Sequence, residues 1–457
     1  MKNVEACLKK YKQEALLKYI ESAPANVRES LVAQLLKVDF EVFFPMMAGV
    51  ESSVDFDSSS LSGLEPHPVI SFNEVRSASH ESIGSKAFSR GEVAFFVVAG
   101  GQGSRLGFEH PKGMFPASPF GRSLFQIHFE KVKECGCRFG FSPHFLVMTS
   151  ETNHSETQEY LRAQNYFGLL KENVHVFQQG TLPAIDFDGN LILAEKDRLF
   201  LAPDGHGGSL AAIRKHGLIK VLHAAGVKYL SYFQVDNPLV NMCDTSFFGA
   251  HISSGSEMSS KVLKKRDPLE KLGNAVSRAG VSCVVEYSDL AEHLARRRTE
   301  SGDLVFAFGS IGIHSFNLSF IERVTEDGHQ LPFHKATKKI PIFNVKSQAF
   351  ETPVAANGKK YEQFVFDAIP LAHKTIFAET LREEEFAPVK NRDGEDSVAS
   401  SKELQSAFFR GWFQHAGYDV RNVGKVEVAP SFALSEREFT QKIKQFLKAV
   451  PKDIFLG

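Results

Sequence analysis

A glycine-rich segment with two nearby cations is the part of the sequence best suited to chemistry. Three glycines within residues 100–103 follow an uncharged apolar run at 95–99, and this pattern predicts a buried strand that leads into a tight loop. Glycines let the backbone approach a ligand closely, and successive loop N–H groups can surround an anion. Arg105 and Lys112 add two positive charges just beyond the glycines. The segment therefore predicts a polyphosphate-binding loop.

The loop matches neither of two well-known phosphate-binding fingerprints. Counted from Gly101, Leu106 stands where the dinucleotide motif G-x-G-x-x-G has its third glycine. The sequence also has no Gly-Lys-Ser or Gly-Lys-Thr of the ATPase type. Taken alone, the loop has a simpler explanation, a glycine-rich turn that only joins a strand to a helix.

Other polar residues follow predicted strands or bends further along the chain. Asp236 comes directly after an apolar strand at 229–235, and Mg²⁺ prefers one or two carboxylates together with substrate phosphates. An Asp-Asn-Pro sequence is equally typical of a plain turn. His206 lies in a glycine-rich turn before a helix, where the turn can also serve only to start that helix. The remaining candidates of this kind are Gln179, Glu286 and Lys390.

Composition narrows the class of protein. The 457 residues indicate two or three domains, and the formal net charge of −1 gives no basic excess for a nucleic-acid surface. The five cysteines are scattered, and no histidine or cysteine spacing indicates a zinc site. We find neither an apolar leader at the N-terminus nor an apolar run of the ~20 residues that a membrane span needs. These features predict a cytoplasmic protein without nucleic-acid or membrane partners.

Strands and helices are expected to alternate along most of the chain, which indicates an α/β fold with a largely parallel sheet. We expect a helical N-terminal region with a serine-rich wrapping loop at 1–90, the α/β domain at 91–391, and a small C-terminal domain at 392–457. Strands are predicted at 93–99, 144–149, 174–177, 229–235, 281–287 and 364–366, and helices at 1–44, 123–135, 209–225, 402–416 and 436–448. Ligands of such sheets bind beyond the carboxyl ends of the strands, where the glycine loop is expected.

Seven segments, taken in this order, resemble the UTP-dependent sugar pyrophosphorylases, the family of the UDP-N-acetylhexosamine and UDP-glucose pyrophosphorylases. The segments are 99–107 with 111–114, 177–180, 182–184, 202–205, 235–237, 284–288, and 357–360 leading to 364–367. The resemblance runs from about residue 95 to residue 391. It implies a Rossmann-like nucleotidyltransferase domain that joins UTP to a sugar-1-phosphate, releases pyrophosphate and uses Mg²⁺.

The resemblance also implies a role for individual residues on the nucleotide side. The backbone of Ala99, Gly100 and Gly101 would hold the UTP phosphates and ribose. Gln179 would contact the uracil edge, and Gly205 would pack close to the base. Arg105 and Lys112 would bind the triphosphate, Asp236 would coordinate Mg²⁺, and Lys390 would neutralise phosphate charge near the new bond.

On the sugar-phosphate side, the resemblance implies His206, Glu286, Ser310 and Lys360. Two of these positions depart from the hexosamine branch, which usually has asparagine in place of both His206 and Ser310. A Gly-His-Gly turn is typical of the glucose branch. An amide that binds a sugar substituent is not replaced freely by a hydroxyl or a ring. The motifs as a whole favour N-acetylglucosamine-1-phosphate, with glucose-1-phosphate as the alternative.

Two more distant functions are possible on a similar sheet. A glycosyltransferase that consumes a UDP-sugar usually carries an Asp-x-Asp metal motif, and the segment 235–237 has no second carboxylate. A non-catalytic sensor of nucleotide sugars would have no need of Lys112 and Lys390. Both therefore rank below the uridylyltransferase. The sequence gives no indication of the oligomeric state.

Overall fold

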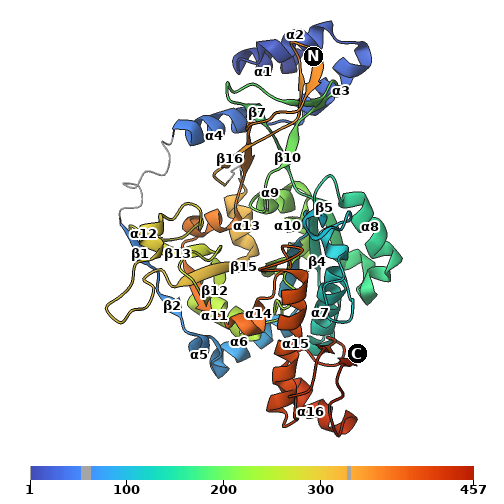
Figure 1. Ribbon diagram of the computed structural model, residues 1–457, viewed down its shortest axis with the longest axis vertical. Helices are drawn as coiled ribbons and strands as arrows, with labels where there is room; N and C mark the ends of the chain where they lie inside the picture. The colour runs from blue at the N-terminus through green and yellow to red at the C-terminus, as the bar shows by residue number, and fades with distance from the viewer. Residues whose placement is uncertain (1, 53–62, 327–330) are drawn as a thin grey trace. The chain divides into compact units, whose positions relative to one another are not determined.

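The computed structural model describes residues 2–52, 63–326 and 331–457, and the chain forms two compact units (Figure 1). Unit 1 contains Met1–Ser60, Gln179–Ala211 and His329–Asp367, and unit 2 contains Leu61–Gln178, Ala212–Gly328 and Ala368–Gly457. These units divide the chain differently from the boundaries expected at residues 90 and 391, because two internal segments pack with the N-terminal helices. The division into domains 1–90, 91–391 and 392–457 stays a prediction.

Unit 2 is built on a sheet that has 11 strands among the described residues. The main path runs β2 (Val69–Ile70), β20 (Thr375–Glu379), β12 (Met258–Lys264), β15 (Phe308–Asn317), β11 (Tyr229–Gln234), β3 (Val93–Val98), β4 (Phe145–Thr149) and β5 (Val174–Gln178). Along this path β15 alone is antiparallel to its neighbours. Three further strands, β1 (Leu64–Pro66), β13 (Gly273–Arg278) and β14 (Val281–Val285), extend it. The predicted α/β fold with a largely parallel sheet is confirmed.

The sequence of β3 explains its central place. Its six residues are apolar, and five of them are buried, as expected for a parallel strand covered on both faces. Phe95 and Val97 belong to a core that also contains Phe88 of α6 (Ala78–Ser89) and Phe129 of α7 (Leu124–Phe139). The strand thus carries the glycine loop out of a rigid core.

The remaining helices of unit 2 follow the expected pattern in part. The helix predicted at 209–225 is two helices, α9 (Gly208–Lys215) and α10 (Leu218–Ala224), because Gly217 between them has a left-handed φ of 70°. The others are α5 (Phe72–Val75), α8 (His154–Ala163), α11 (Thr245–Ser254), α12 (Glu292–Ala295), α13 (Leu318–Val324), α14 (Arg382–Glu385), α15 (Val398–His415) and α16 (Glu436–Phe446). With the strands β21 (Val426–Val428) and β22 (Ile454–Leu456), α15 and α16 enclose a separate cluster around Phe413 and Phe439.

Two secondary-structure predictions are wrong. Residues 364–366, predicted as a strand, form none: Phe364 precedes the 3₁₀ helix η6 (Val365–Leu371), and the other two residues begin it, because three apolar residues are too short a run to fix a strand. The wrapping loop predicted before residue 90 contains α5 and α6. Serine is typical of helix starts as well as of loops, and the Ser71 hydroxyl accepts from the Glu74 N–H at the start of α5. Residues 53–62 of that prediction lie outside the described residues.

Unit 1 combines N-terminal helices with small antiparallel sheets (Figure 1), and the region predicted as helical at 1–44 forms four helices that reach residue 52. The helices are α1 (Lys2–Lys10), α2 (Glu14–Ser22), α3 (Ala25–Leu35) and α4 (Phe40–Ser52). The strands are β6 (Thr181–Pro183), β7 (Ile185–Asp186), β8 (Leu193–Glu195), β9 (Arg198–Leu199), β10 (Leu201–Pro203), β16 (His334–Lys338), β17 (Ile342–Asn344), β18 (Ala349–Glu351) and β19 (Gly358–Glu362). Leu8, Leu31 and Tyr361 share one core, so the segments after residues 179 and 329 pack on the helices.

None of the helices in the described parts of the chain is long and apolar enough to cross a membrane.

Candidate functional site

The glycine loop leaves the carboxyl end of β3 and is held in shape by a buried asparagine. Asn153 is fully buried, and its side-chain amide donates to the carbonyl oxygens of Ala99 at 2.9 Å and Gly101 at 3.2 Å. Its Oδ1 accepts from the Ser150 N–H at 2.8 Å. The Lys112 N–H also donates to the Gly101 carbonyl at 3.1 Å. These bonds use the loop carbonyls and fix the course of the backbone.

Two glycines of the loop differ in the space that surrounds them. A Cβ added to Gly103 would lie 2.7 Å from the Phe108 carbonyl oxygen, so the fold itself requires glycine there. A Cβ added to Gly101 would meet no described atom within 4 Å, its chain neighbours aside. Gly101 is also exposed and has no left-handed φ. The absence of a side chain at Gly101 therefore leaves space beside the loop that the described residues do not fill.

Lys112 and Asp236 meet at the carboxyl ends of neighbouring parallel strands. The strands β3 and β11 pair in parallel up to Val98 and Gln234, so the residues that follow them lie at the same edge of the sheet. The Lys112 ammonium donates to Asp236 Oδ2 at 3.1 Å, and the two side chains are only 16% and 14% exposed.

Helix α7 holds the turn that carries Asp236. The His128 ring donates through Nε2 to the Val235 carbonyl at 2.9 Å, and burial lowers the pKa of His128 to about 3, so the ring is neutral. One helical turn later, the Lys131 ammonium donates to the carbonyls of Pro238 at 2.7 Å and Val240 at 2.9 Å. From one face of the helix, His128 thus holds the backbone before Asp236 and Lys131 the backbone after it.

Lys390 belongs to the same cluster. Burial raises the pKa of Asp236, but the charges of Lys112 and Lys390, with the hydrogen bond from Lys112, outweigh burial and leave that pKa below its usual value. The Lys390 ammonium lies 3.1 Å from Asp396 Oδ2 and 5.5 Å from the centre of the Phe386 ring. Lys112, Asp236 and Lys390 therefore form one charged cluster in unit 2, and Asp236 is ionised at neutral pH.

Arg105 also lies in unit 2, exposed in the 3₁₀ turn η1 (Ser104–Leu106). Its guanidinium forms no hydrogen bond or ion pair with the part of the chain that the structure describes. The cation is thus available to a ligand.

Ser310 and Glu286, predicted on the sugar-phosphate side, lie around the start of β13. Ser310 of β15 is 9% exposed and stands opposite Gly273 in the antiparallel register. A Cβ added to Gly273 would lie 4.0 Å from Glu286 Oε1, just after β14. The sheet therefore brings these two residues to neighbouring places in unit 2.

The other predicted residues lie in unit 1. Gly205 has a left-handed φ of 85°, and a Cβ there would be 2.5 Å from the Gln363 carbonyl, so only glycine fits. His206 accepts through Nδ1 from the Val365 N–H at 3.1 Å and stacks on Phe364. Burial lowers the pKa of His206 to about 4. The ring is therefore a neutral part of the unit 1 framework.

Lys360 and Gln179 complete the set in unit 1. The Lys360 ammonium lies 4.6 Å from the centre of the Phe200 ring, and burial lowers its pKa. Gln179 is partly exposed and follows β5 directly.

Sequence reasoning missed Asn153, His128 and Lys131, which act through backbone carbonyls. Asn153 lies four residues beyond β4, so the signal that identified Asp236, a polar residue after an apolar strand, could have found it. For His128 and Lys131 the sequence shows only polar residues on an amphipathic helix. Among the described residues, no group of three or more His, Cys, Asp or Glu side chains could hold a metal ion by itself.

A largely parallel sheet with a glycine loop and a charged cluster at its carboxyl edge defines an α/β protein that binds its ligand beyond the ends of the strands. The family model described as UTP–glucose-1-phosphate uridylyltransferase matches residues 39–454. The chain belongs to this family, which confirms the resemblance read from the sequence and the predicted enzyme class.

Named relatives cover most of the chain. It is 35% identical over 347 residues to UDP-N-acetylhexosamine pyrophosphorylase-like protein 1 of Homo sapiens, covering 74% of this chain and 68% of that protein. It is 33% identical over 407 residues to the UDP-N-acetylglucosamine pyrophosphorylase of Saccharomyces cerevisiae, covering 84% of each.

Solved structures agree in fold. The uridine diphosphate N-acetylglucosamine pyrophosphorylase from Trypanosoma brucei, solved in complex with an inhibitor, has a TM-score of 0.83 at 28% identity and covers 99% of this chain and 97% of that one. A UDP-glucose phosphorylase from the same organism has a TM-score of 0.62 at 14% identity, covers 96% of this chain and 87% of that one, and shows likeness of fold alone.

Proposed function

We propose that this protein transfers a uridylyl group from UTP to N-acetylglucosamine-1-phosphate and releases pyrophosphate. The observation that carries the proposal is the cluster of Lys112, Asp236 and Lys390 beside a glycine loop at the edge of a parallel sheet. The names of the relatives at 33% and 35% identity support this type of reaction.

The proposed reaction needs positioning and charge more than a nucleophile on the protein. A phosphate oxygen of the sugar-1-phosphate attacks the α-phosphorus of UTP, and the bond from that phosphorus to the bridging oxygen of the β-phosphate breaks. Backbone N–H groups at Gly100 and Gly101 would bind the phosphates, with close approach possible because Gly101 carries no side chain. Arg105 and Lys112 would attract the departing pyrophosphate, and Lys390 the charge at the reacting phosphate.

Asp236 fits the proposed Mg²⁺ cofactor. Mg²⁺ takes one or two carboxylates and completes its shell with water and substrate phosphates, and Asp236 supplies a single carboxylate that the two lysines keep ionised. When bound, the ion would neutralise phosphate charge. Lys112 pairs with Asp236 in the structure and would turn to the triphosphate as it binds.

The residues in unit 1 keep the roles that the family resemblance implies. Gln179 would contact the uracil edge, Gly205 would pack against the base, and Lys360 would bind the sugar phosphate. His206 already accepts a hydrogen bond from the Val365 N–H, so we propose that its Nε2 side alone is available to the sugar phosphate.

The second candidate substrate is glucose-1-phosphate, and Ser310 is the residue that favours it. A serine hydroxyl reaches less far than the asparagine amide usual in the hexosamine branch. At a site that binds an acetamido group, loss of that amide would weaken binding of the sugar. Glu286 beside it would bind sugar hydroxyls in either case.

One assay tests the proposal. The protein is mixed with UTP, Mg²⁺ and one of three sugars, N-acetylglucosamine-1-phosphate, N-acetylgalactosamine-1-phosphate or glucose-1-phosphate, and pyrophosphate release is followed. We expect release with N-acetylglucosamine-1-phosphate fastest. Faster release with glucose-1-phosphate would correct the sugar, and no release with any sugar would refute the uridylyltransferase in favour of a glycosyltransferase or a sensor.

A further inference from the structure

The segment that leads to Lys390 is tied to the turn of Asp236 at three points. The Asn237 side-chain amide donates through Nδ2 to the Glu385 carbonyl at 2.6 Å, and its Oδ1 accepts from the Ala387 N–H at 3.1 Å. The Asp236 carbonyl accepts from the Val389 N–H at 2.9 Å. Asn237 is only 4% exposed, so both bonds form away from bulk water, where an unpaired amide is costly.

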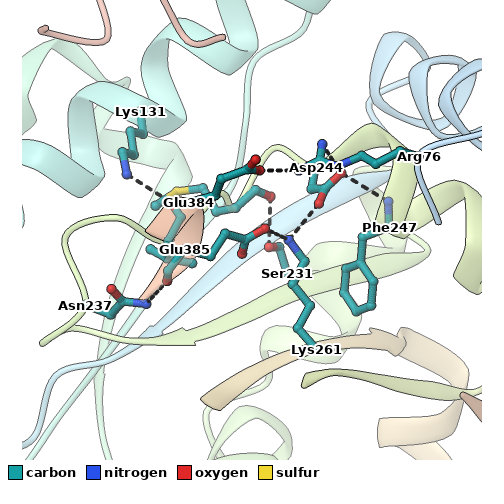
Figure 2. A network of polar contacts seen from close by, with 11 residues as sticks. Arg76, Lys131, Ser231, Asn237, Asp244, Phe247, Lys261, Glu384 and Glu385 are labelled. Carbon is teal, nitrogen blue, oxygen red and sulfur yellow. Dashed lines mark hydrogen bonds and ion pairs between the residues drawn. The ribbon is translucent and has the colours of Figure 1, made fainter. Parts of the chain in front are cut away.

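Glu385, the first of these three points, is itself held by a buried ion network (Figure 2). Its carboxylate pairs with the Lys261 ammonium, which also donates to Asp244 Oδ2 at 2.7 Å. The side chains of Lys261, Asp244 and Glu385 are 2%, 4% and 1% exposed. Figure 2 shows the Asn237 amide directed at the Glu385 backbone and Lys261 between the two carboxylates.

The outer end of the network is anchored by Arg76, whose guanidinium lies 3.7 Å from Asp244 and 3.3 Å from Glu384. Asp244 also accepts from the Phe247 N–H at the start of α11. The backbone at Glu385 is therefore fixed from the side of the sheet and from the side of α11. Within the described residues, the Asn237 side chain connects this fixed backbone to the turn of Asp236, because both its amide nitrogen and its amide oxygen form hydrogen bonds with the segment 385–387.

We propose that Asn237 is a positioning residue that sets the separation between Asp236 and Lys390. The expected effect of Asn237 on turnover rests on the proposed function. Its expected effect on the position of Lys390 does not depend on that function. The two charges act on different parts of the reacting phosphate system, and a displacement of ~1 Å in such groups can cost about 10²-fold in rate.

Asn237→Ala removes both amide bonds and leaves Asp236, Lys112 and Lys390 in the chain. We expect kcat to fall about 10²-fold while KM for UTP changes far less, because the lost contribution belongs to the transition state. Gln405→Ala is the matched control. Gln405 is also a buried amide of unit 2, 3% exposed, and donates to the Ala117 carbonyl at 3.0 Å. That control is expected to lower the melting temperature without the fall in kcat.

Asn237→Asp preserves the size of the side chain and removes only one of the two bonds. The introduced carboxyl still accepts from the Ala387 N–H, but it has no N–H to donate to the Glu385 carbonyl. We therefore expect kcat of this variant to fall as well, with KM for UTP changed far less.

Lysine labelling gives a readout that needs no turnover. Competitive acetylation with mass spectrometry compares Lys390, 37% exposed, with the reference Lys228, 60% exposed. We expect faster labelling of Lys390 relative to Lys228 in both Asn237 variants and no change in Gln405→Ala. Unchanged labelling of Lys390 in a folded Asn237 variant would overturn the positioning role. If labelling of Lys390 changes in the Asn237 variants but the wild-type protein releases no pyrophosphate, only the proposed function is overturned.

Discussion

Removal of the Lys261 charge is expected to destabilise unit 2 strongly. In Lys261→Met the buried carboxylates of Asp244 and Glu385 lose their shared cation, and among the described residues Glu385 has no other ion pair. Breaking a buried pair by removing one partner costs ~3–5 kcal/mol, because the other charge stays buried. With ~2.1 cal/mol/K of unfolding entropy per residue over roughly 300 residues of unit 2, this loss lowers the melting temperature by ~5–8 °C.

The loss should depend on pH in a defined direction. Burial acts to raise the pKa of Asp244, but Lys261 and then Arg76 outweigh it and lower that pKa to about 2. A lowered folded-state pKa stabilises the protein above the unfolded value of 3.8, and this stability disappears as the pH falls towards 2. Without Lys261 the carboxyls protonate at higher pH, so the deficit of the variant narrows as the medium becomes acidic.

Calorimetric or fluorescence melting of wild type and Lys261→Met at several pH values measures both effects. Lys228→Met is the matched control, since Lys228 pairs with Glu92 at 2.7 Å but is 60% exposed and surface pairs contribute little. Adding Glu385→Gln to Lys261→Met should recover part of the loss. Equal melting temperatures for wild type and Lys261→Met at neutral pH would refute the reasoning.

Three further outcomes are expected. Lys112→Ala and Lys390→Ala should each fold and lose about 10²–10³-fold in kcat, because in the proposed mechanism each removes a cation that would face phosphate charge; wild-type pyrophosphate release by both would contradict the mechanism. Gly101→Ala should weaken UTP binding in calorimetric titration with an unchanged melting temperature, since its Cβ meets no described atom within 4 Å; unchanged binding would remove the loop from the site. Gly84→Ala should lower the melting temperature, because its Cβ would lie 1.8 Å from the Thr245 carbonyl oxygen and force α6 from α11; an unchanged melting temperature would show that the helices can separate at no cost.

The sequence predicted the fold where its apolar runs were long. The run at β3 is continuous and, apart from Ala94, β-branched or aromatic, and such a pattern has few other solutions than a buried strand. The run at 364–366 has only three apolar residues, and the structure places the last two in a 3₁₀ helix. Local pattern also could not show that residues 179–211 and 329–367 pack with the N-terminal helices, because that grouping depends on contacts between segments far apart in the chain.

Some residues of the candidate site could likewise be predicted from the sequence, and others could not. Lys112, Asp236 and Lys390 could be named from the sequence because each follows a motif or a strand end, and the structure brings them into one cluster. Asn153 could have been found by the same signal, since it lies four residues beyond β4. His128 and Lys131 could not, since their role is to bond backbone carbonyls at 2.7–2.9 Å. In the sequence they are only polar residues on an amphipathic helix.

The pairing of Lys112 with Asp236 has a consequence for how a triphosphate would enter. The ion pair at 3.1 Å keeps both charges compensated while only 16% and 14% of the side chains are exposed, and unpaired charges so placed would be costly. A polyphosphate that draws Lys112 away leaves the Asp236 carboxylate with Lys390 as its remaining nearby cation. That carboxylate then gains most from a divalent cation brought with the phosphates. In the proposed mechanism, binding of the nucleotide and of Mg²⁺ would therefore be coupled through Lys112.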